Sequence, residues 1–222
     1  MSINVEVART QMVNQQVRAW DVLDPAVLAV LAQVPREQFV PPRFRNLAFA
    51  DIALPLGSGS GGAQSMMTPQ VEGRLLQALT LRGTDRALEV GTGSGFLTAC
   101  LARLTGQVTS LEILPELADS ARRNLRGVST WNAEVRTGDV FGFRPDAPYD
   151  VIVITGSLPK PDDRFQHWLA EGGRLFLVTG EDPLMRARLV TRQGPEAWTT
   201  TTLFETSLPA LLHATQPSKF IF

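Results

Sequence analysis

The sequence has little of several residue types on which whole classes of protein depend. It contains one cysteine, Cys100, which excludes an intramolecular disulfide framework and a cysteine-based zinc site. Only two histidines are present, His167 and His213, so a histidine metal centre is not expected either. We therefore predict that the protein has no metal site. Neither histidine has a partner at a catalytic spacing, and we interpret both as structural residues.

An excess of charge and long apolar runs are missing too. The 21 basic residues are offset by 22 acidic ones, and the formal net charge is −1. The basic excess that favours nucleic acid or a membrane surface is therefore lacking. No apolar run reaches membrane-spanning length, and the first 20 residues lack the apolar core of a signal peptide. These absences predict a cytoplasmic protein with no nucleic-acid or membrane partner.

The composition that remains is that of an ordinary globular chain. Hydrophobic residues make up 44% of the 222 residues and charged residues 19%, enough to build a single buried core. The first 50 residues have apolar side chains at helical spacing. Asp24 and Pro25 are typical of an N-cap followed by proline at the first helical position. Residues 57–62, GSGSGG, have the composition of a flexible loop.

From Pro69 onward the pattern predicts a helix and then an alternation of short apolar runs with helical segments. Such alternation is typical of βαβ units around a parallel sheet. The runs DVIVIT and RLFLVTG are apolar almost throughout, as strands covered on both faces are. The tail differs, because TTTTLFE and KFIF are β-rich with no helix between them. We expect these two segments to pair antiparallel at one edge of the sheet.

A glycine-rich segment, LEVGTGSGF from Leu88 to Phe96, stands where a strand should pass into a helix. Its glycines allow a tight turn and close approach of the backbone to a ligand, and a helix N-terminus presents free N–H groups. Phe96 occupies the position at which a dinucleotide fingerprint needs its last glycine. The spacing therefore disfavours a nicotinamide-dependent oxidoreductase.

Acidic residues follow the next two predicted strands. Glu112 ends the strand after the glycine-rich turn, where a carboxylate can accept hydrogen bonds from ribose hydroxyls. Asp139 follows the third strand, where it could meet an adenine amino group. Thr155 ends the fourth strand and should face the same crevice, because ligands of such folds lie across the carboxyl ends of the strands. Asp150 precedes that strand and is interpreted as structural.

These motifs resemble those of a known family. LEVGTGSG, followed by SLEI, GDV and APYDVIVITG, resembles the class I S-adenosylmethionine-dependent methyltransferases. More narrowly, VPREQFVP (34–41), AFADIALPLG (48–57) and residues 64–69 resemble the protein-L-isoaspartate O-methyltransferase family. The nucleotide-loop motif is shared by many methyltransferases, whereas the two N-terminal segments are far more specific.

The resemblance implies an α/β fold: a seven-stranded, mostly parallel, doubly wound Rossmann-like sheet with an N-terminal helical extension and an antiparallel C-terminal edge. We expect residues 1–68 to form a helical cap with a substrate-side loop, and residues 69–222 to form the cofactor-binding unit. The implied activity is repair of damaged protein, by esterification of an isoaspartyl carboxylate with S-adenosylmethionine as methyl donor. The residues that we predict at the cofactor site are Gln64, Glu89, Gly91, Thr92, Gly93, Ser94, Gly95, Glu112, Ile113, Asp139, Val140 and Thr155.

One departure from the family lies in the substrate-side loop. The family has a serine two residues before the proline that corresponds to Pro69, and this chain has Met67 there. Ser65 and Thr68 are then the candidate catalytic hydroxyls, although Thr68 is equally well placed to cap the helix at Pro69. Met67 is compatible with ordinary core packing, and it also keeps two alternatives open: a methyltransferase with a different acceptor, and a cofactor-binding homologue without catalysis.

Overall fold

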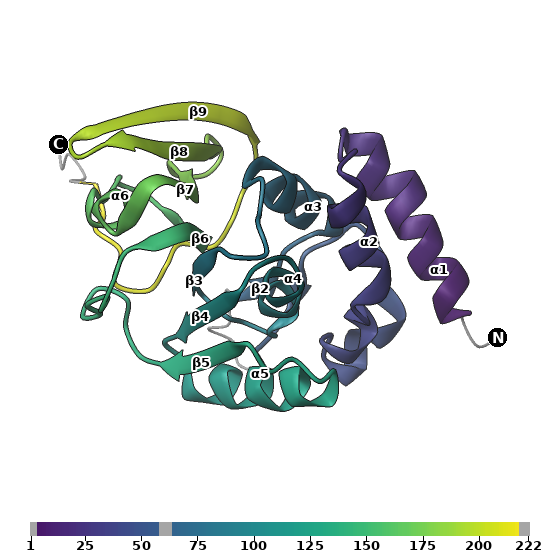
Figure 1. Ribbon diagram of the computed structural model, residues 1–222. Helices are drawn as coiled ribbons and strands as arrows, with labels where there is room; N and C mark the ends of the chain where they lie inside the picture. Colours follow the sequence, from purple (N-terminus) through teal and green to yellow (C-terminus); the bar gives the residue numbers. More distant parts are fainter. Residues whose placement is uncertain (1–3, 58–63, 218–222) are drawn as a thin grey trace, which may run out of the picture.

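The computed structural model describes residues 4–57 and 64–217. The expected GSGSGG loop falls largely on residues 58–63, and the expected KFIF strand falls on residues 219–222, so both lie outside the described residues. Figure 1 shows a helical N-terminal region beside a twisted sheet, with the remaining helices packed along it.

The N-terminal region is built from short helices whose bounds follow local sequence rules. Asp24 caps α2, its carboxylate accepting from the Ala26 N–H at 2.8 Å, and Pro25 stands at the first helical position as expected. The elements of this region are α1 (Val5–Gln11), the π-helical η1 (Met12–Val17), the 3₁₀ turns η2 (Arg18–Trp20), η3 (Arg36–Gln38) and η4 (Pro42–Leu47), and α2 (Pro25–Gln33).

Two short strands, β1 (Leu54–Pro55) and β2 (Ser65–Met66), pair antiparallel between this region and the rest of the chain. The main sheet has seven strands in the order β5-β4-β3-β6-β7-β8-β9. The helices and strands from Pro69 onward are, in chain order, α3 (Pro69–Ala78), β3 (Arg86–Val90), α4 (Phe96–Leu104), β4 (Gln107–Glu112), α5 (Pro115–Gly127), β5 (Ala133–Thr137), β6 (Tyr149–Leu158), α6 (Arg164–His167), β7 (Leu169–Thr179), β8 (Arg186–Gly194) and β9 (Ala197–Glu205).

The pairing confirms the predicted α/β fold with a parallel body and an antiparallel edge. Strands β3 to β7 pair parallel, whereas β8 pairs antiparallel with both β7 and β9. The expected pairing of residues 199–205 with KFIF falls outside the described residues, but the sequence did not indicate the partner that these residues have. These residues belong to β9 and pair with β8, whose mixed polar sequence RARLVTRQG gave no clear period-2 signal.

The central strands are buried on both faces of the sheet, which explains their apolar runs. Side chains of a strand alternate between faces. Along β6, Val151 and Val153 therefore join one apolar cluster, with α3, α4 and α5, whereas Ile152 and Ile154 join the other, with α6. No helix in the described residues is long and apolar enough to cross a membrane.

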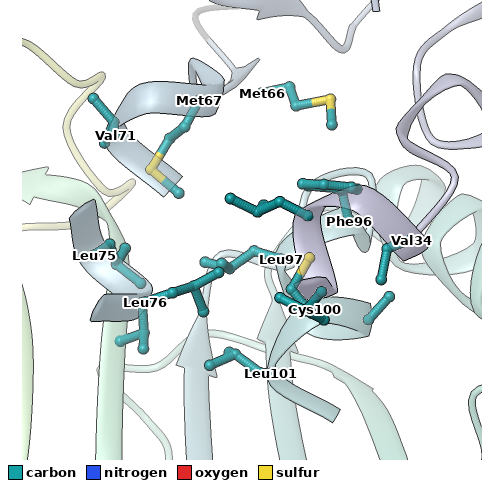
Figure 2. Packing of buried hydrophobic residues seen from close by; sticks show 14 of the residues in the cluster. Val34, Met66, Met67, Val71, Leu75, Leu76, Phe96, Leu97, Cys100 and Leu101 are labelled. Carbon is teal, nitrogen blue, oxygen red and sulfur yellow. The ribbon is translucent and has the colours of Figure 1, made fainter. Parts of the chain in front are cut away.

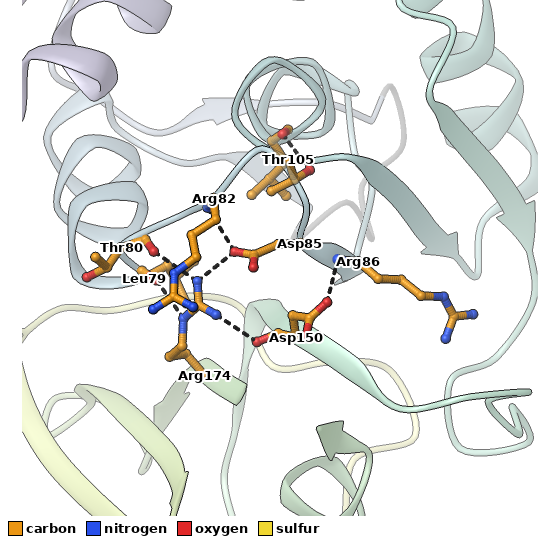
Figure 3. Close-up of polar contacts among 9 residues, drawn as sticks. Leu79, Thr80, Arg82, Asp85, Arg86, Thr105, Asp150 and Arg174 are labelled. Atoms are coloured by element: carbon orange, nitrogen blue, oxygen red, sulfur yellow. Dashed lines mark hydrogen bonds and ion pairs between the residues drawn. The ribbon is translucent and has the colours of Figure 1, made fainter. Parts of the chain in front are cut away.

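Polar contacts close the end of the sheet at which β3 and β6 begin. Arg174 of β7 donates to Asp85 at 2.6 Å and to the carbonyl oxygens of Leu79 and Thr80, each at 2.9 Å. The Arg86 N–H donates to Asp150 at 2.8 Å (Figure 3). These contacts tie α3, β3, β6 and β7 together, and Asp150 has the structural role that was expected of it.

Candidate functional site

The glycine-rich turn joins β3 to α4 at the opposite end of the sheet, where the parallel strands finish. Gly91 has a φ of 93°, and a Cβ there would clash with the Thr155 hydroxyl. That hydroxyl lies 2.9 Å from the carbonyl oxygen of Val90 and 2.7 Å from that of Gly91. Gly95 is the N-cap of α4 in the left-handed region, with a φ of 86°. Both positions therefore need glycine, as the motif predicts.

Glu112 ends β4 beside this turn. One of its carboxylate oxygens accepts from the Gly93 N–H at 2.8 Å and the other accepts from the Leu114 N–H at 3.0 Å. The side chain thus links the glycine turn to the loop before α5. Because each carboxylate oxygen has more than one lone-pair site, Glu112 can still accept bonds from a pair of hydroxyls.

Glu89 lies beneath the same turn and is fully buried. Its Oε2 accepts from the Thr98 hydroxyl at 2.5 Å and from the Ser110 hydroxyl at 2.6 Å. Its Oε1 is buried, with no hydrogen-bond partner in the described residues. Burial raises the pKa of Glu89 to about 8, although the two hydroxyls act in the opposite direction. A buried oxygen that finds no partner in the protein is open to a polar group of a ligand.

A cleft runs along the carboxyl ends of the strands as two adjoining cavities. The larger one has mainly apolar walls, with Glu112 and Asp139 as its carboxylates. Seven further predicted residues lie on it: Gln64, Ser65, Gly91, Gly93, Ile113, Val140 and Thr155. The smaller cavity brings in Glu89, Thr92 and Ser94. Gly95 and Thr68 line neither cavity, since Gly95 begins α4 and Thr68 begins α3.

The two candidate hydroxyl residues of the substrate-side loop, Ser65 and Thr68, lie in different surroundings. Ser65 lines both cavities, whereas the Thr68 hydroxyl accepts from the Val71 N–H at 3.4 Å as the N-cap of α3. Met66 and Met67 are buried, with 4% and 7% of their surface exposed. Figure 2 shows Met66 near Phe96, with the Met67 sulfur directed toward Leu75. Both methionines also line the smaller cavity.

Arg36 holds this loop in place. The side chain is fully buried and forms an ion pair with Glu72 of α3. It also donates to the Met67 carbonyl oxygen at 2.7 Å and to the Ala48 carbonyl oxygen at 2.9 Å. The motif VPREQFVP contains this arginine, but the sequence alone did not indicate that it would bind the loop. A buried guanidinium with this number of acceptors fixes three chain segments relative to one another.

Two other features of the site were missed. Residues 209–212 line the larger cavity, and the ring Nδ1 of His213 lies 2.8 Å from Asp139 Oδ2. His213 and Asp139 are 74 positions apart, so no local pattern could join them. His167, by contrast, packs edge-on against Trp198, in agreement with a structural role. In the described residues, no group of three or more possible ligands is placed to hold a metal ion.

The chain is similar to known proteins in both sequence and fold. A family model described as protein-L-isoaspartate(D-aspartate) O-methyltransferase matches residues 8–208. A protein-L-isoaspartate O-methyltransferase 1 of Rhodopseudomonas palustris (strain HaA2) is 43% identical over 175 residues, 78% of this chain and 70% of the relative. Another, from Anaeromyxobacter sp. (strain Fw109-5), is 40% identical over 195 residues, 87% of each chain.

Solved structures agree in fold at lower identity. A protein-L-isoaspartate O-methyltransferase superposes with a TM-score of 0.80 at 22% identity. The match covers 91% of this chain and 65% of that structure, slightly less than two thirds of its length. A Plasmodium falciparum structure described as a putative enzyme of this kind, in complex with S-adenosyl-L-homocysteine, has a TM-score of 0.79 at 18% identity. The match covers 95% of this chain and 99% of that structure.

Proposed function

The chain belongs to the protein-L-isoaspartate(D-aspartate) O-methyltransferase family, and we propose that it methylates the abnormal carboxylate of isoaspartyl residues in damaged proteins or peptides. It is an S-adenosylmethionine-dependent methyltransferase. The observation that carries the substrate assignment is the match of the family model to residues 8–208, which includes the cap and the loop as well as the glycine turn.

The cleft fits this cofactor in its donors and acceptors. Glu112 would accept from the ribose hydroxyls, and Asp139, which lines the same cavity, would accept from the adenine amino group. Apolar walls there, including Leu111 and Val140, suit a flat aromatic base. The unpartnered Oε1 of Glu89 beneath the glycine turn would accept from the positively charged amino group of the methionine end once the carboxyl ionises, which a nearby positive charge favours.

Methyl transfer to a carboxylate needs little acid–base help from the protein. S-adenosylmethionine supplies a methyl carbon on a positively charged sulfur, and its transfer to a carboxylate oxygen leaves S-adenosylhomocysteine and a neutral methyl ester. A carboxylate is already ionised near neutral pH, because its ordinary pKa is about 4. The protein therefore acts mainly by positioning, for which effective molarities can reach roughly 10⁵ M.

Ser65 is the hydroxyl that we propose orients the acceptor. Its position on both cavities supports this role, and Arg36 restrains the same loop through the Met67 carbonyl oxygen. Thr68 remains a weaker candidate, since its hydroxyl caps α3. Met67, which replaces the family serine, is a buried apolar residue and offers no side-chain hydrogen bond to the acceptor.

We further propose that residues 1–68 act as a cap on the unit formed by residues 69–222. Gln16 of η1 donates to the Phe49 carbonyl oxygen at 3.1 Å, and Arg9 of α1 pairs with Glu37 at 2.7 Å. These contacts hold residues 1–68 together, and the ion pair of Arg36 with Glu72 joins them to α3, which supports a cap on the substrate side of the cleft.

The direct test is transfer of labelled methyl from S-adenosylmethionine to an isoaspartyl peptide, with the matched aspartyl peptide as control. We expect a base-labile methyl ester on the isoaspartyl peptide alone. Binding of S-adenosylhomocysteine is measured in parallel by calorimetry. Binding without transfer would contradict the substrate assignment. It would favour another acceptor or a non-catalytic role, the two alternatives that the replacement of the family serine by Met67 raises. Absence of binding would contradict the cofactor assignment.

A further inference from the structure

Residues 208–214, here called the C-terminal strap, cross the end of β6 and form one wall of the larger cavity. The Ser157 N–H donates to the Pro209 carbonyl oxygen at 2.8 Å, and the Leu211 N–H donates to the Ser157 carbonyl oxygen at 2.9 Å. The buried Ser157 hydroxyl donates to the Leu208 carbonyl oxygen at 2.9 Å. In Figure 1 the yellow segment after β9 runs back past β6 on its way to the C-terminus. The strap is therefore seated on the sheet at the cofactor cleft.

His213 lies where the strap passes Asp139. Its backbone is in the left-handed region, with a φ of 65°, and its Nδ1 lies 2.8 Å from Asp139 Oδ2. The other oxygen of Asp139 accepts from the Phe141 N–H at 2.9 Å. Partial burial acts to raise the pKa of Asp139, but the bonds from His213 and Phe141 outweigh it and hold that pKa below its usual value. Both oxygens of a carboxylate on the cavity wall are thus held.

We propose that His213 is a positioning residue that orients Asp139 toward the 6-amino group of the cofactor's adenine, and so sets the preference for an amino over an oxo group at that position. This inference rests on the proposed cofactor. An aspartate with a third of its side chain exposed would otherwise sample several rotamers, and the cofactor would have to order it on binding. An imidazole N–H fixes the carboxylate beforehand and leaves each oxygen a lone pair for the base.

The left-handed backbone at His213 permits a matched pair of variants. His213→Gly removes the imidazole without backbone strain, because glycine adopts positive φ freely. His213→Asn tolerates the same conformation and keeps an N–H donor near the position of Nδ1. Any difference between the two variants therefore reports the hydrogen bond to Asp139. His167→Ala, which removes the other histidine from its contact with Trp198, is the control for loss of an imidazole elsewhere.

The measurement is the dissociation constant of S-adenosylhomocysteine and of its 6-oxo analogue, S-inosylhomocysteine, for each protein. We expect the wild type, His213→Asn and His167→Ala to prefer the adenosyl compound to similar degrees. In His213→Gly that preference should fall roughly fivefold, the size of one modest hydrogen bond, with the inosyl affinity little changed. A general loss of folding would weaken both ligands together and would not change their ratio.

The failures can be told apart. A full preference for the adenosyl compound in His213→Gly would overturn this inference and leave the cofactor assignment intact. An equal loss in His213→Gly and His213→Asn would overturn it as well, because the retained donor would then have no effect. A wild-type protein that binds neither compound would overturn the proposed function and this inference together.

Discussion

Two buried carboxylates at opposite ends of the main sheet, Asp85 and Glu89, differ in how their oxygens are paired. At the amino-terminal ends of β3 and β6, Asp85 accepts from Arg174 at 2.6 Å and from the Arg82 N–H at 2.9 Å (Figure 3). At the carboxyl ends, Glu89 keeps a buried oxygen without a partner in the described residues. Asp139 at that end lies on an open cavity wall.

The difference indicates what each end does. Asp85 is paired with a buried guanidinium and lines neither cavity, so its contacts stabilise the fold. Glu89 has an unpaired buried oxygen and lines the smaller cavity, where a ligand could offset the free-energy cost of that oxygen. We therefore expect substitutions at the amino end to change stability and substitutions at the carboxyl end to change binding, with Glu89 as the residue that affects both.

The largest effect is expected at the amino end. Asp85→Ala leaves the Arg174 guanidinium, whose side chain is only 12% exposed, without its carboxylate. Removal of one partner of a buried pair typically costs about 3–5 kcal/mol in the free energy of unfolding. Urea denaturation measures this loss, and calorimetry below the melting temperature should give an unchanged affinity for S-adenosylhomocysteine.

The control for this variant is Asp146→Ala, which removes the exposed partner of Arg86 at the same end of the sheet. Its effect on stability should be small, because surface ion pairs contribute little. Comparable losses in the two variants, or a weaker cofactor affinity in Asp85→Ala, would contradict the division of roles between the two ends.

The next effect concerns Glu89 and depends on pH. Burial raises its pKa to about 8, from the ordinary value of 4.5. Between these values the folded protein keeps a proton that the unfolded chain has lost, so stability falls as the pH rises through this window. Glu89→Gln cannot ionise and should remove this dependence. The free energy of unfolding of the wild type should fall relative to the variant by a few kcal/mol between pH 5 and pH 8.

Urea denaturation of both proteins at pH 5, 6.5 and 8 measures the effect of Glu89. Glu171→Gln, which neutralises an exposed carboxylate on β7, is the matched control and should follow the wild type. If the stability of Glu89→Gln followed the wild type in parallel across this range, the carboxyl would not be protonated in the folded protein.

A smaller effect, on the affinity for S-adenosylhomocysteine, is expected from substitution of Glu112. Glu112→Gln keeps one acceptor oxygen for the neighbouring N–H groups but loses the charge that would bind the ribose hydroxyls. A hydrogen bond to a charged group contributes about 1.5–3 kcal/mol, so the dissociation constant of S-adenosylhomocysteine should rise roughly 10- to 100-fold. Glu116→Gln, an exposed residue in the first turn of α5, should leave it unchanged. Equal affinities of the two variants would remove Glu112 from the ribose site.

The carboxyl end of the sheet was also the part of the molecule most open to prediction from sequence. Glycine turns and strand-end carboxylates follow local rules, so the segment from Gly91 to Gly95 and Glu112 could be placed from the amino-acid pattern alone. The same holds for helices that begin with an N-cap residue followed by proline, such as α2 after Asp24 and α3 after Thr68.

What could not be predicted depends on contacts between distant segments. The strand β8 was missed because arginines interrupt its apolar residues without a clear alternation, and only the tertiary context pairs it with β9. Arg36 and His213 have partners 31 to 74 positions away. Single-sequence patterns carry no information on such pairs.

The smallest effects separate the two candidate hydroxyls of the substrate-side loop. Thr68→Ala removes the N-cap of α3 and should cost up to about 1 kcal/mol of stability, with the methyl-transfer rate unchanged below the melting temperature. Thr68→Ser keeps the cap and is its control. Ser65→Ala should lower the methyl-transfer rate and leave stability nearly unchanged, because Ser65 lines the cleft. The loss of one orienting hydrogen bond predicts a roughly 3- to 10-fold lower kcat on an isoaspartyl peptide at nearly unchanged stability. A lower kcat for Thr68→Ala, with Ser65→Ala fully active, would exchange the two roles and extend the catalytic part of the cleft as far as the start of α3.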